Sequence, residues 1–586
     1  MGDGSITMAS VRSALDAVSG MNYGENGHIQ YAWGLKMEKQ MDDDKWQEDF
    51  VRLSFQLVRG DGSEDGEAKI GMAMRNLIAA AQRDAEGGRQ KLALLMKLTM
   101  YTRDPIAGKG EWALFYTMMN VWMSFPSYEN ALVATFPYLF TEVEKGRLPI
   151  GSWKDVKYLY KTNDGEPQVM ERLLAYAADT IIMDVKTSRP SLLGRWAPRE
   201  KASNGSFARC ARRLARVYME RSGWVGEDQH SPATFRYVMA QYRKVLSLLN
   251  ARLKTPQIKM SAPEGNWSSI DFDKDVTSVT MRKQRKAFLA RNRSEYRTEL
   301  QRADRQECAE NYLKYVAACL GGEKKMKGKR VGLDALVRDA IVCGESADGQ
   351  VRESVCLQWE AQGADCPELE NCIAMVDTSS SMTWANCPYY AALGLGIRIA
   401  EKSTLGKRLI QFAARPQWIN LDSATDFVDM VETVHHSEAG YSTDLIAALR
   451  LVAGACRANC VTPDDVANLT LIICSDMQVN EACSCASVGS PLDERVVRIF
   501  EEAGRDSIHG QPYPTPHIVW WNMRQTDGFP STSTHPNMTM LSGYSDKILD
   551  SLAKKGRMGL TDTTPWAFLR DALHNERYSW VDGLFE

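Results

Sequence analysis

The sequence predicts two folded parts of different class: an all-α helical-repeat part, ring- or solenoid-like in shape, and an α/β part with a doubly wound parallel sheet. The 586 residues exceed what one hydrophobic core usually serves, so more than one domain is expected. In the first half, apolar residues recur every three to four positions, the spacing of amphipathic helices. From residue 365 onward, short apolar runs alternate with such helical stretches, an order typical of a parallel sheet covered by helices.

We expect four segments: an N-terminal arm at 1–45, an all-α domain at 46–340, a linker at 341–364 and an α/β domain at 365–586. The arm is rich in glycine and weakly patterned, so it either packs on another part or is loosely ordered. No fixed period relates the helices of the all-α domain, so no regular repeat family is indicated. These helices are expected at 46–57, 68–85, 89–100, 111–122, 128–143, 153–162, 167–184, 206–221 and 232–253.

Charge is divided unevenly along the chain. Residues 1–340 hold 53 Lys and Arg against 42 Asp and Glu, whereas residues 341–586 hold 18 against 32. This asymmetry indicates either a polyanionic partner for the basic part or docking of the two parts on each other. No apolar run reaches the ~20 residues of a membrane span, so no membrane association is expected. The thirteen cysteines include no C-x-x-C pair, which favours reduced thiols and a cytoplasmic protein, with a nuclear or virion-associated one as the alternatives.

Three loops in the all-α domain combine aromatic and charged residues. The loop at 101–111 is no phosphate-binding P-loop, because Gly110 and Glu111 follow Lys109 where Ser or Thr should stand. The simpler interpretation of all three loops is helix capping with ion pairs between neighbouring helices. Their distinctive residues are Arg103, Asp104 and Lys109 in the first loop, Trp153, Lys154 and Asp155 in the second, and Trp196 in the third.

A dense basic stretch follows near 281–305, and a second one lies near 324–330. Phe288 and Tyr296 are interleaved with the basic residues of the first stretch. Phosphates bind such patches and aromatic rings stack on unpaired bases, so nucleic-acid binding is one interpretation; a solvated helix face is the other. The expected nucleic-acid-binding residues are Arg282, Lys283, Arg285, Lys286, Arg291, Arg293, Lys324, Lys325, Lys327, Lys329 and Arg330.

The α/β domain contains five apolar runs of strand length. They are Cys372–Val376, Leu409–Ala413, Leu469–Cys474, His517–Trp521 and the shorter Thr539–Leu541. Helical patterns at 389–401, 443–456, 492–503 and 545–554 stand between or after them. The alternation predicts a sheet with helices on both faces.

The strongest functional signal lies where two of these strands end. Asp377, Ser379 and Ser381 form a D-x-S-x-S pattern directly after the first run, and Asp476 ends a later one. Thr443 opens a helical stretch between them. Ligands of open α/β sheets gather at the carboxyl ends of the strands, and hard divalent cations prefer oxygen ligands. We therefore expect these five residues to hold Mg²⁺, with Mn²⁺ or Ca²⁺ as substitutes; ordinary turn and N-cap roles are the alternative.

This arrangement resembles the Ro autoantigen family, in which an all-α ring called the TROVE domain precedes a von Willebrand factor A domain. An uncharacterised Ro-like family of eukaryotes and large DNA viruses is more similar still. Besides the three loops above, the resemblance rests on Tyr242-Arg243, Ser475-Asp476-Met477, Trp521-Asn522-Met523-Arg524 and Leu541-Ser542-Gly543-Tyr544-Ser545. It covers roughly residues 50–580. Ser380 stands where the Ro pattern usually has a glycine.

The resemblance implies an RNA-binding protein. Ro-like proteins bind structured and misfolded non-coding RNA, with single-stranded ends in the ring and duplex RNA on its basic outer face. It also implies a metal-ion-dependent adhesion site made of the five residues above. The leading hypothesis is thus a non-enzymatic RNA-binding protein with a metal-bearing α/β domain. The alternative is a metal-dependent protein-interaction or structural component of a large assembly or virion, in which a partner carboxylate completes the metal shell. With only eight histidines and no evident base beside the metal pattern, an enzyme is not expected.

Overall fold

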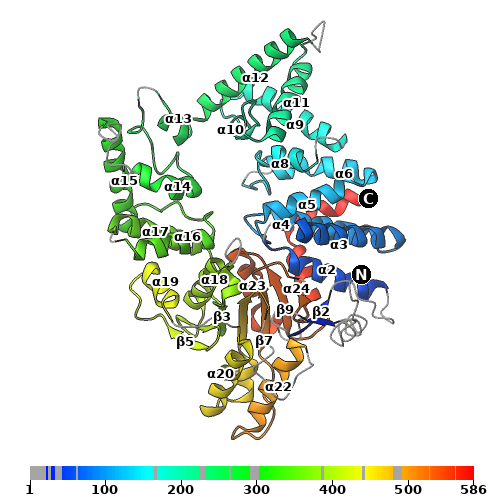
Figure 1. Ribbon diagram of the computed structural model, residues 1–586, viewed down its shortest axis with the longest axis vertical. Coiled ribbons are helices and arrows are strands. Elements are labelled where there is room, and N and C mark those ends of the chain that lie inside the picture. The colour runs from blue at the N-terminus through cyan, green and yellow to red at the C-terminus, as the bar shows by residue number, and fades with distance from the viewer. Residues whose placement is uncertain are drawn as a thin grey trace, which may run out of the picture.

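The computed structural model has a helical part that follows a ring-shaped path, and a sheet that closes the path at its base (Figure 1). The predicted order of an α part followed by an α/β part is confirmed. The structure describes residues 21–23, 28–32, 42–60, 64–143, 146–163, 168–224, 231–262, 265–290, 302–346, 348–383, 388–437, 443–478, 491–526, 528–560 and 563–586.

One side of the ring is built by the helices before residue 254. They are α2 (Asp42–Gln56), α3 (Glu64–Arg83), α4 (Gly88–Arg103), α5 (Trp112–Met123), η1 (Pro126–Tyr128), α6 (Glu129–Ala134), α7 (Phe136–Phe140), α8 (Asp155–Thr162), α9 (Gln168–Lys186), α10 (Leu193–Trp196), α11 (Gly205–Arg221) and α12 (Pro232–Leu253). Each helix packs on its sequence neighbours, as the periodicity predicted. The expected helix at 128–143 is broken into short pieces, because Pro137 stands where an uninterrupted helix would need its N–H.

The other side of the ring begins with a sharp turn after α12. Lys254 takes the left-handed conformation (φ 47°) and ends α12, and Pro256 then stands at the start of α13. This side consists of α13 (Pro256–Met260), α14 (Ser278–Phe288), α15 (Ala303–Leu320), α16 (Leu333–Gly344) and α17 (Gly349–Gly363). In Figure 1 it descends opposite α8 to α11 and returns the chain to the sheet.

The sheet has six strands in the order β5-β4-β3-β6-β7-β9. They are β3 (Cys372–Asp377), β4 (Arg408–Phe412), β5 (Gln417–Asn420), β6 (Thr470–Ser475), β7 (His517–Asn522) and β9 (Met538–Ser542). All pairs are parallel except β4 with β5. Counted from β3, this is the doubly wound order 3-2-1-4-5-6. The strands are added toward one edge up to β5 and toward the other edge from β6 onward, so the strand order reverses between β3 and β6. The five expected strands are confirmed.

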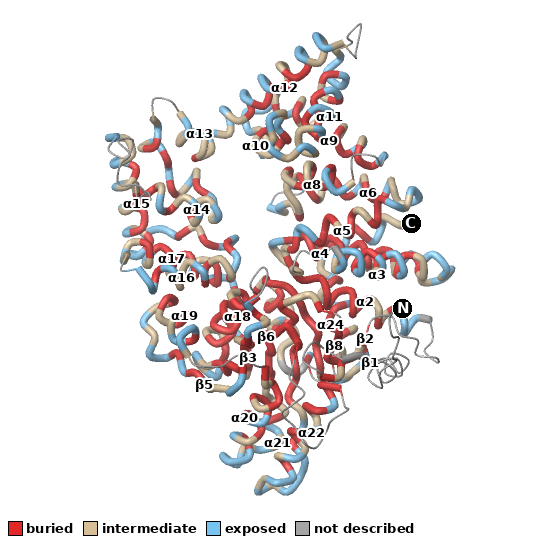
Figure 2. The backbone as a smooth tube through the Cα atoms, in the orientation of Figure 1, coloured by how far each residue is buried: buried red, intermediate tan, exposed pale blue. Residues whose placement is uncertain are grey.

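Helices cover the sheet in two groups. α18 (Pro388–Lys402) packs on β3, β4 and β6 together with α19 (Phe427–His435), while α20 (Leu445–Ala458) packs with α22 (Leu492–Arg505). β3, β6, β7 and β9 are buried along their whole length, and the outward helix faces are exposed (Figure 2). The remaining elements are η3 (Ser380–Thr383), α21 (Pro463–Ala467), η5 (Asp546–Ile548), α23 (Leu549–Leu560), α24 (Pro565–Leu573) and η6 (Glu576–Phe585).

Of two segments of the expected domain plan, the arm packs on another part as one of its two expectations has it, and the linker differs. The N-terminal arm contributes β1 (Met21–Tyr23) and β2 (Ile29–Ala32), and β2 pairs antiparallel with β8 (Gly528–Phe529) of the α/β part. The expected linker at 341–364 lies in α16 and α17, and α16 packs on both α18 and α19. Apolar residues such as Val351, Val355 and Trp359 are buried there, so this segment is a packed layer between the two parts rather than a tether.

The carboxyl edge of the sheet faces the helical part. Asn522 at the end of β7 donates from Nδ2 to the carbonyl of Phe55 at 3.0 Å. Ser542 at the end of β9 lies 2.5 Å from Nζ of Lys109, which also donates to the carbonyl of Ser54 at 2.5 Å. These contacts join the end of α2 and the 104–111 loop to the strand ends. Among the described residues, none of the helices has the length and apolarity that crossing a bilayer requires.

Candidate functional site

The D-x-S-x-S residues lie at the end of β3, where the sheet order reverses. Asp377 is the last residue of the strand and is fully buried. Its Oδ1 accepts from the backbone N–H of Ser379 at 2.9 Å, which turns the chain back over the carboxylate. The hydroxyl oxygens of Ser379 and Ser381 are 3.1 Å apart. The alternating spacing therefore brings both hydroxyls to one side of the loop beside Asp377.

Asp476 lies in the neighbouring strand end, directly after β6. It is fully buried, and its Oδ1 accepts from the backbone N–H of Gln478 at 3.2 Å. Ser475, the residue before it, donates from Oγ to Oδ2 of Asp377 at 2.5 Å. The register pairs Val376 with Cys474, so the two aspartates leave adjacent strands at nearly the same level. They therefore share one edge of the sheet, as the sequence predicts.

Thr443 reaches the same edge from a third loop. It is 2 % exposed and precedes Asp444, whose backbone N–H donates to the carbonyl of Ala413 at 2.8 Å just beyond β4. On the adjoining strand end, the N–H of Thr378 donates to the carbonyl of Phe412 at 3.1 Å. The residue after Thr443 and the residue after Asp377 thus donate to consecutive carbonyls at the end of β4.

The electrostatics of this edge favour a cation. Burial, and then repulsion from Asp476, raise the pKa of Asp377 to about 7. A positive charge between two buried carboxylates would relieve both effects, and three hydroxyls stand at the same edge. Among the described residues no group of three or more His, Cys, Asp or Glu side chains could hold a metal, so a cation here would depend on hydroxyl ligands as well as the two carboxylates. The donor set fits a hard divalent ion such as Mg²⁺.

Sequence reasoning missed two members of this site. Ser475 orients Asp377, and its signal was only its place before Asp476 at the strand end. Arg524 follows β7 and binds Asp476, with Nε 3.1 Å and Nη2 3.0 Å from Oδ2. Arg524 stands in one of the segments that carry the resemblance, but no sequence pattern assigns it to the aspartate that follows the preceding strand, β6.

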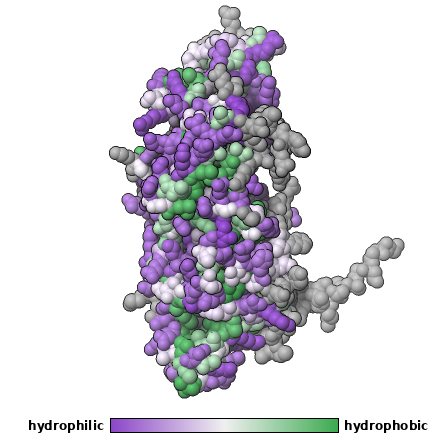
Figure 3. All heavy atoms as spheres, turned by 90° about the vertical axis from the view of Figure 1, so that its left-hand side faces the viewer, coloured by the Kyte–Doolittle hydropathy of each residue, from purple (hydrophilic) through white to green (hydrophobic). Residues whose placement is uncertain are grey.

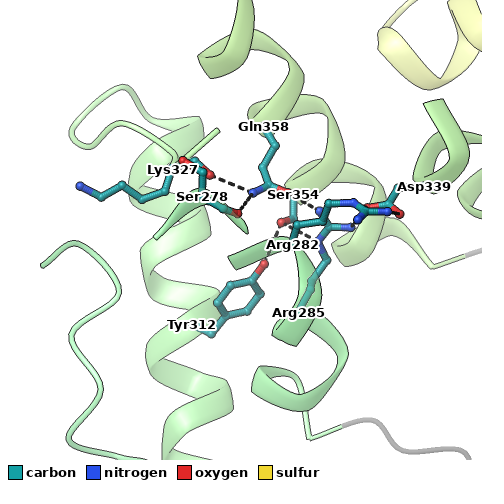
Figure 4. A network of polar contacts seen from close by, with 8 residues as sticks. All are labelled: Ser278, Arg282, Arg285, Tyr312, Lys327, Asp339, Ser354 and Gln358. Carbon is teal, nitrogen blue, oxygen red and sulfur yellow. Dashed lines mark hydrogen bonds and ion pairs between the residues drawn. The ribbon is translucent and has the colours of Figure 1, made fainter. Parts of the chain in front are cut away.

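Two residues of the expected nucleic-acid stretch have internal roles instead. Arg285 is 4 % exposed and donates to Ser354 Oγ at 3.1 Å and to Asp339 Oδ2 at 3.3 Å. Arg282 forms a two-pronged pair with Asp339 at 2.9 and 2.8 Å. Figure 4 shows both guanidinium groups turned into a network that also includes Tyr312 and Gln358. Their expected role as phosphate ligands is corrected: they join α14 to α15, α16 and α17.

The other expected basic residues are distributed differently. Lys283 and Lys286 are exposed on α14. In the segment that follows α15, the exposed basic residues are Lys324, Lys325, Lys329 and Arg330. Lys327 and Lys329 pair with Asp273 at 3.5 Å and Asp365 at 2.6 Å. Figure 3 shows that the side of the molecule bearing these helices is mostly hydrophilic, with separate apolar patches. Arg291 and Arg293 lie outside the described residues.

A second basic surface lies on the opposite side of the ring and is rich in aromatic rings. We define the basic–aromatic surface as Trp112, Lys154, Lys157, Tyr158 and Trp196, contributed by α5, α8 with the loop before it, and α10. Trp112 is 47 % exposed and lies 5.7 Å from the Tyr158 ring. Lys154 Nζ stands 5.2 Å from the centre of the Tyr158 ring, and Lys157 Nζ stands 5.8 Å from that of Trp196.

The basic–aromatic surface has little acidic compensation. Burial, and then the nearby charges of Lys154 and Arg199, lower the pKa of Lys157. Within the described residues neither Lys154 nor Lys157 has a carboxylate within ion-pair distance. The segment 193–260, which includes α10 to α13, has 14 Lys and Arg against 4 Asp and Glu. That excess of basic residues was the sequence signal for the part of the surface around Trp196. The denser basic runs further along the chain obscured it.

The remaining loop residues mostly hold helices together. Asp155 accepts from Arg103 at 2.9 Å and from the Tyr116 hydroxyl at 2.6 Å. Trp153 is buried and stacks on Phe140, with ring centres 4.9 Å apart. Asp104 and Lys109 also make buried contacts, Asp104 with η6 and Lys109 with the end of β9. The expected ion pairs between helices are present for Arg103 with Asp155, while Asp104 pairs with the distant η6 and Trp153 and Lys109 are held by other buried contacts.

Two families match parts of the chain. Residues 371–572, which run from just before β3 to α24 and include all five expected metal ligands, match a family described as Domain of unknown function (DUF7788). Residues 168–307, which run from α9 into α15 and include Trp196, match one described as Domain of unknown function (DUF2828). No curated protein matches the sequence.

Proposed function

We propose that this protein binds RNA, including unpaired segments, through the basic–aromatic surface. Ring stacking on bases and lysine contacts with phosphates are the two interactions that non-sequence-specific single-strand binding combines. Trp112 offers an exposed ring next to Lys154, and Trp196 offers a second ring next to Lys157. This alternation of rings and ammonium groups is the observation that carries the proposal. The resemblance to Ro-like proteins and the excess of positive charge in residues 1–340 support it.

The α/β part is proposed to be a von Willebrand factor A-type domain with a divalent-cation site. The strand order, the antiparallel β5 and the meeting of Asp377, Asp476 and the hydroxyls at one edge support this proposal. Asp377, Ser379, Ser381, Thr443 and Asp476 would hold the cation. When bound, such a cation supplies a positive centre that accepts an anionic group from a ligand.

A metal-dependent protein contact is the second candidate function. The same donor set supports it. Two carboxylates and three hydroxyls leave room in the shell of a divalent cation, and an Asp or Glu of a partner protein could fill that place. In this function RNA is not the ligand, so the two candidates separate in one binding experiment.

The test is binding of a fluorescent single-stranded RNA to the full chain across a salt series. Trp112→Ala is expected to weaken binding roughly 5- to 150-fold, since stacking contributes roughly 1–3 kcal/mol per base. The pair Lys154→Gln with Lys157→Gln is expected to reduce the slope of log affinity against log salt by about 1.4, the effect of two lost phosphate contacts.

A matched control comes from the α/β part. Trp418 on β5 is 48 % exposed, nearly the same as Trp112, and Lys407, just before the partner strand β4, is also exposed. Trp418→Ala with Lys407→Gln is expected to leave RNA affinity and its salt slope unchanged. Equal affinities for the Trp112→Ala variant and the control would overturn the proposed surface, and no RNA binding by the unaltered chain at low salt would favour the protein-contact function.

A further inference from the structure

Arg524 is built into the sheet edge on which the cation site is proposed. Its backbone N–H donates to Oδ1 of Asn522 at 3.1 Å, which turns the chain after β7 toward β6. Its Nε and Nη2 both lie within hydrogen-bond distance of a single oxygen, Oδ2 of Asp476. The arginine side chain is 19 % exposed, while that of Asp476 is fully buried. A positive charge therefore already lies against one of the two buried carboxylates.

Within the part of the chain that the structure describes, the neighbouring carboxylate has no basic side chain within ion-pair distance. Asp377 receives the N–H of Ser379 on one oxygen and the Ser475 hydroxyl on the other. Both are neutral donors, whereas the guanidinium of Arg524 lies against Oδ2 of Asp476. Among the described residues, one acidic group of the site is thus paired with a positive charge and the other is not, and a divalent cation shared by the two would lie close to the guanidinium.

The backbone around Arg524 is anchored on the helical part. Gln525 donates from Nε2 to the carbonyl of Gly66 at 2.9 Å, and the N–H of Thr526 donates to Oε1 of Gln56 at 2.8 Å. Two residues further along, β8 pairs with β2. The main chain is thus held on both sides of Arg524, and its side chain is 19 % exposed.

We propose that Arg524 is an internal competitor of the divalent cation, and that it sets the cation affinity of this site. The inference rests on the proposed metal site and assigns the regulation of that site to one residue. A cation that binds Asp476 meets repulsion from the guanidinium and displaces it from Oδ2. Removing the charge of Arg524 therefore strengthens cation binding. Removing an ordinary metal ligand would have the opposite effect and weaken it.

The experiment measures Mn²⁺ binding to the full chain by calorimetry and by loss of the free-Mn²⁺ electron paramagnetic resonance signal. Arg524→Met keeps the length and removes the charge, and is expected to bind Mn²⁺ at least tenfold more tightly than the unaltered chain. Arg524→Lys keeps the charge and is expected to stay within about threefold of it. Asp377→Asn with Arg524→Met is expected to lose the gain, which locates the Mn²⁺ at this edge.

A second readout covers the case in which Arg524→Met destabilises the fold. The Mn²⁺-induced rise in melting temperature is expected to be larger for Arg524→Met than for the unaltered chain, because the ion then supplies the missing positive charge. Equal or weaker Mn²⁺ binding by a folded Arg524→Met protein overturns the competitor role while leaving the metal site intact. Absence of Mn²⁺ binding by both proteins overturns the metal site, and the inference with it.

Discussion

His517 shows how a single buried residue couples this fold to pH. It lies in the first position of β7 and is 4 % exposed. One ring nitrogen is 2.9 Å from the Thr539 hydroxyl and the other is 3.1 Å from Oδ1 of Asn537. Burial lowers the pKa of His517 to about 4. The neutral ring therefore belongs to the folded state, and the charged ring to the unfolded chain at mildly acidic pH.

The sign of the pH effect follows from that difference. Between pH 6.5 and 4 the unfolded chain binds a proton that the folded protein excludes, so stability is full above about pH 6.5 and falls toward pH 4. The full effect is about 3 kcal/mol at most, from roughly 2.5 units of pKa difference. We expect His517→Gln to flatten the fall in melting temperature between pH 7 and 4.5. His436→Gln, at an exposed position, serves as the control and should keep the fall seen in the unaltered protein.

At the scale of elements, the sequence predicts those strands that consist of one uninterrupted apolar run. Strands β3, β6 and β7 are buried along their whole length and appear in the sequence as uninterrupted apolar runs. Strand β5 alternates burial over four residues at the sheet edge and was missed. Strand β2 was missed because its partner, β8, lies almost 500 residues further on, and no local pattern records that pairing.

The same distinction explains the site predictions. Asp377 and Asp476 follow apolar runs, so the sheet edge brings them together without further information. The arginine at Asp476 comes from another strand end and could not be assigned from sequence. The number of basic residues in this stretch does not show which side of the helix each one occupies. Met281, Arg285 and Phe288 recur at helical spacing and share the buried face of α14, so Arg285 points inward.

The C-terminal element η6 binds the helical part through Asp104. This carboxylate is fully buried and accepts from Arg577 and, at 2.9 Å, from the Tyr578 hydroxyl. Trp580 adds a stacked contact with Tyr138, with ring centres 3.9 Å apart. Asp104→Ala leaves Arg577 and Tyr578 without their acceptor in a buried place, and is expected to cost about 3–5 kcal/mol.

Limited proteolysis and thermal melting check this prediction. Loss of Asp104 should speed the cleavage of residues 576–586 and lower the melting temperature. Asp571→Ala is the control, because Asp571 pairs with Lys555 at an exposed place and should change stability by under about 0.5 kcal/mol. Cleavage as slow as in the unaltered protein would show that the aromatic contacts alone retain η6.

At the scale of the whole molecule, Arg59 joins both sides of the ring at its base. It follows α2 and donates to Glu111 at the start of α5 at 3.0 Å and to Asp334 of α16 at 3.5 Å. Its guanidinium carbon also lies 4.5 Å from the centre of the Tyr544 ring, beyond β9. Helices from opposite sides of the ring and the sheet thus share one side chain.

Arg59→Met should therefore loosen the ring rather than unfold it. We expect faster amide hydrogen exchange in the first turns of both α5 and α16, with little change in the central strands β3 and β6. Arg83→Met on the exposed side of α3 is the control and should change neither helix. Faster exchange confined to α5 would mean that Arg59 serves only its own side of the ring.

The pairing of Asp104 with Arg577 also has a consequence for folding during translation. The two residues are 473 positions apart, so ribosomes complete α4 and the entire sheet before the residues that cover α4 emerge. Throughout that interval the nascent chain displays the apolar surface around Tyr138 and Trp122 to the cell. We therefore expect chaperones that bind apolar surfaces to associate with the chain during translation and to leave it once η6 has docked.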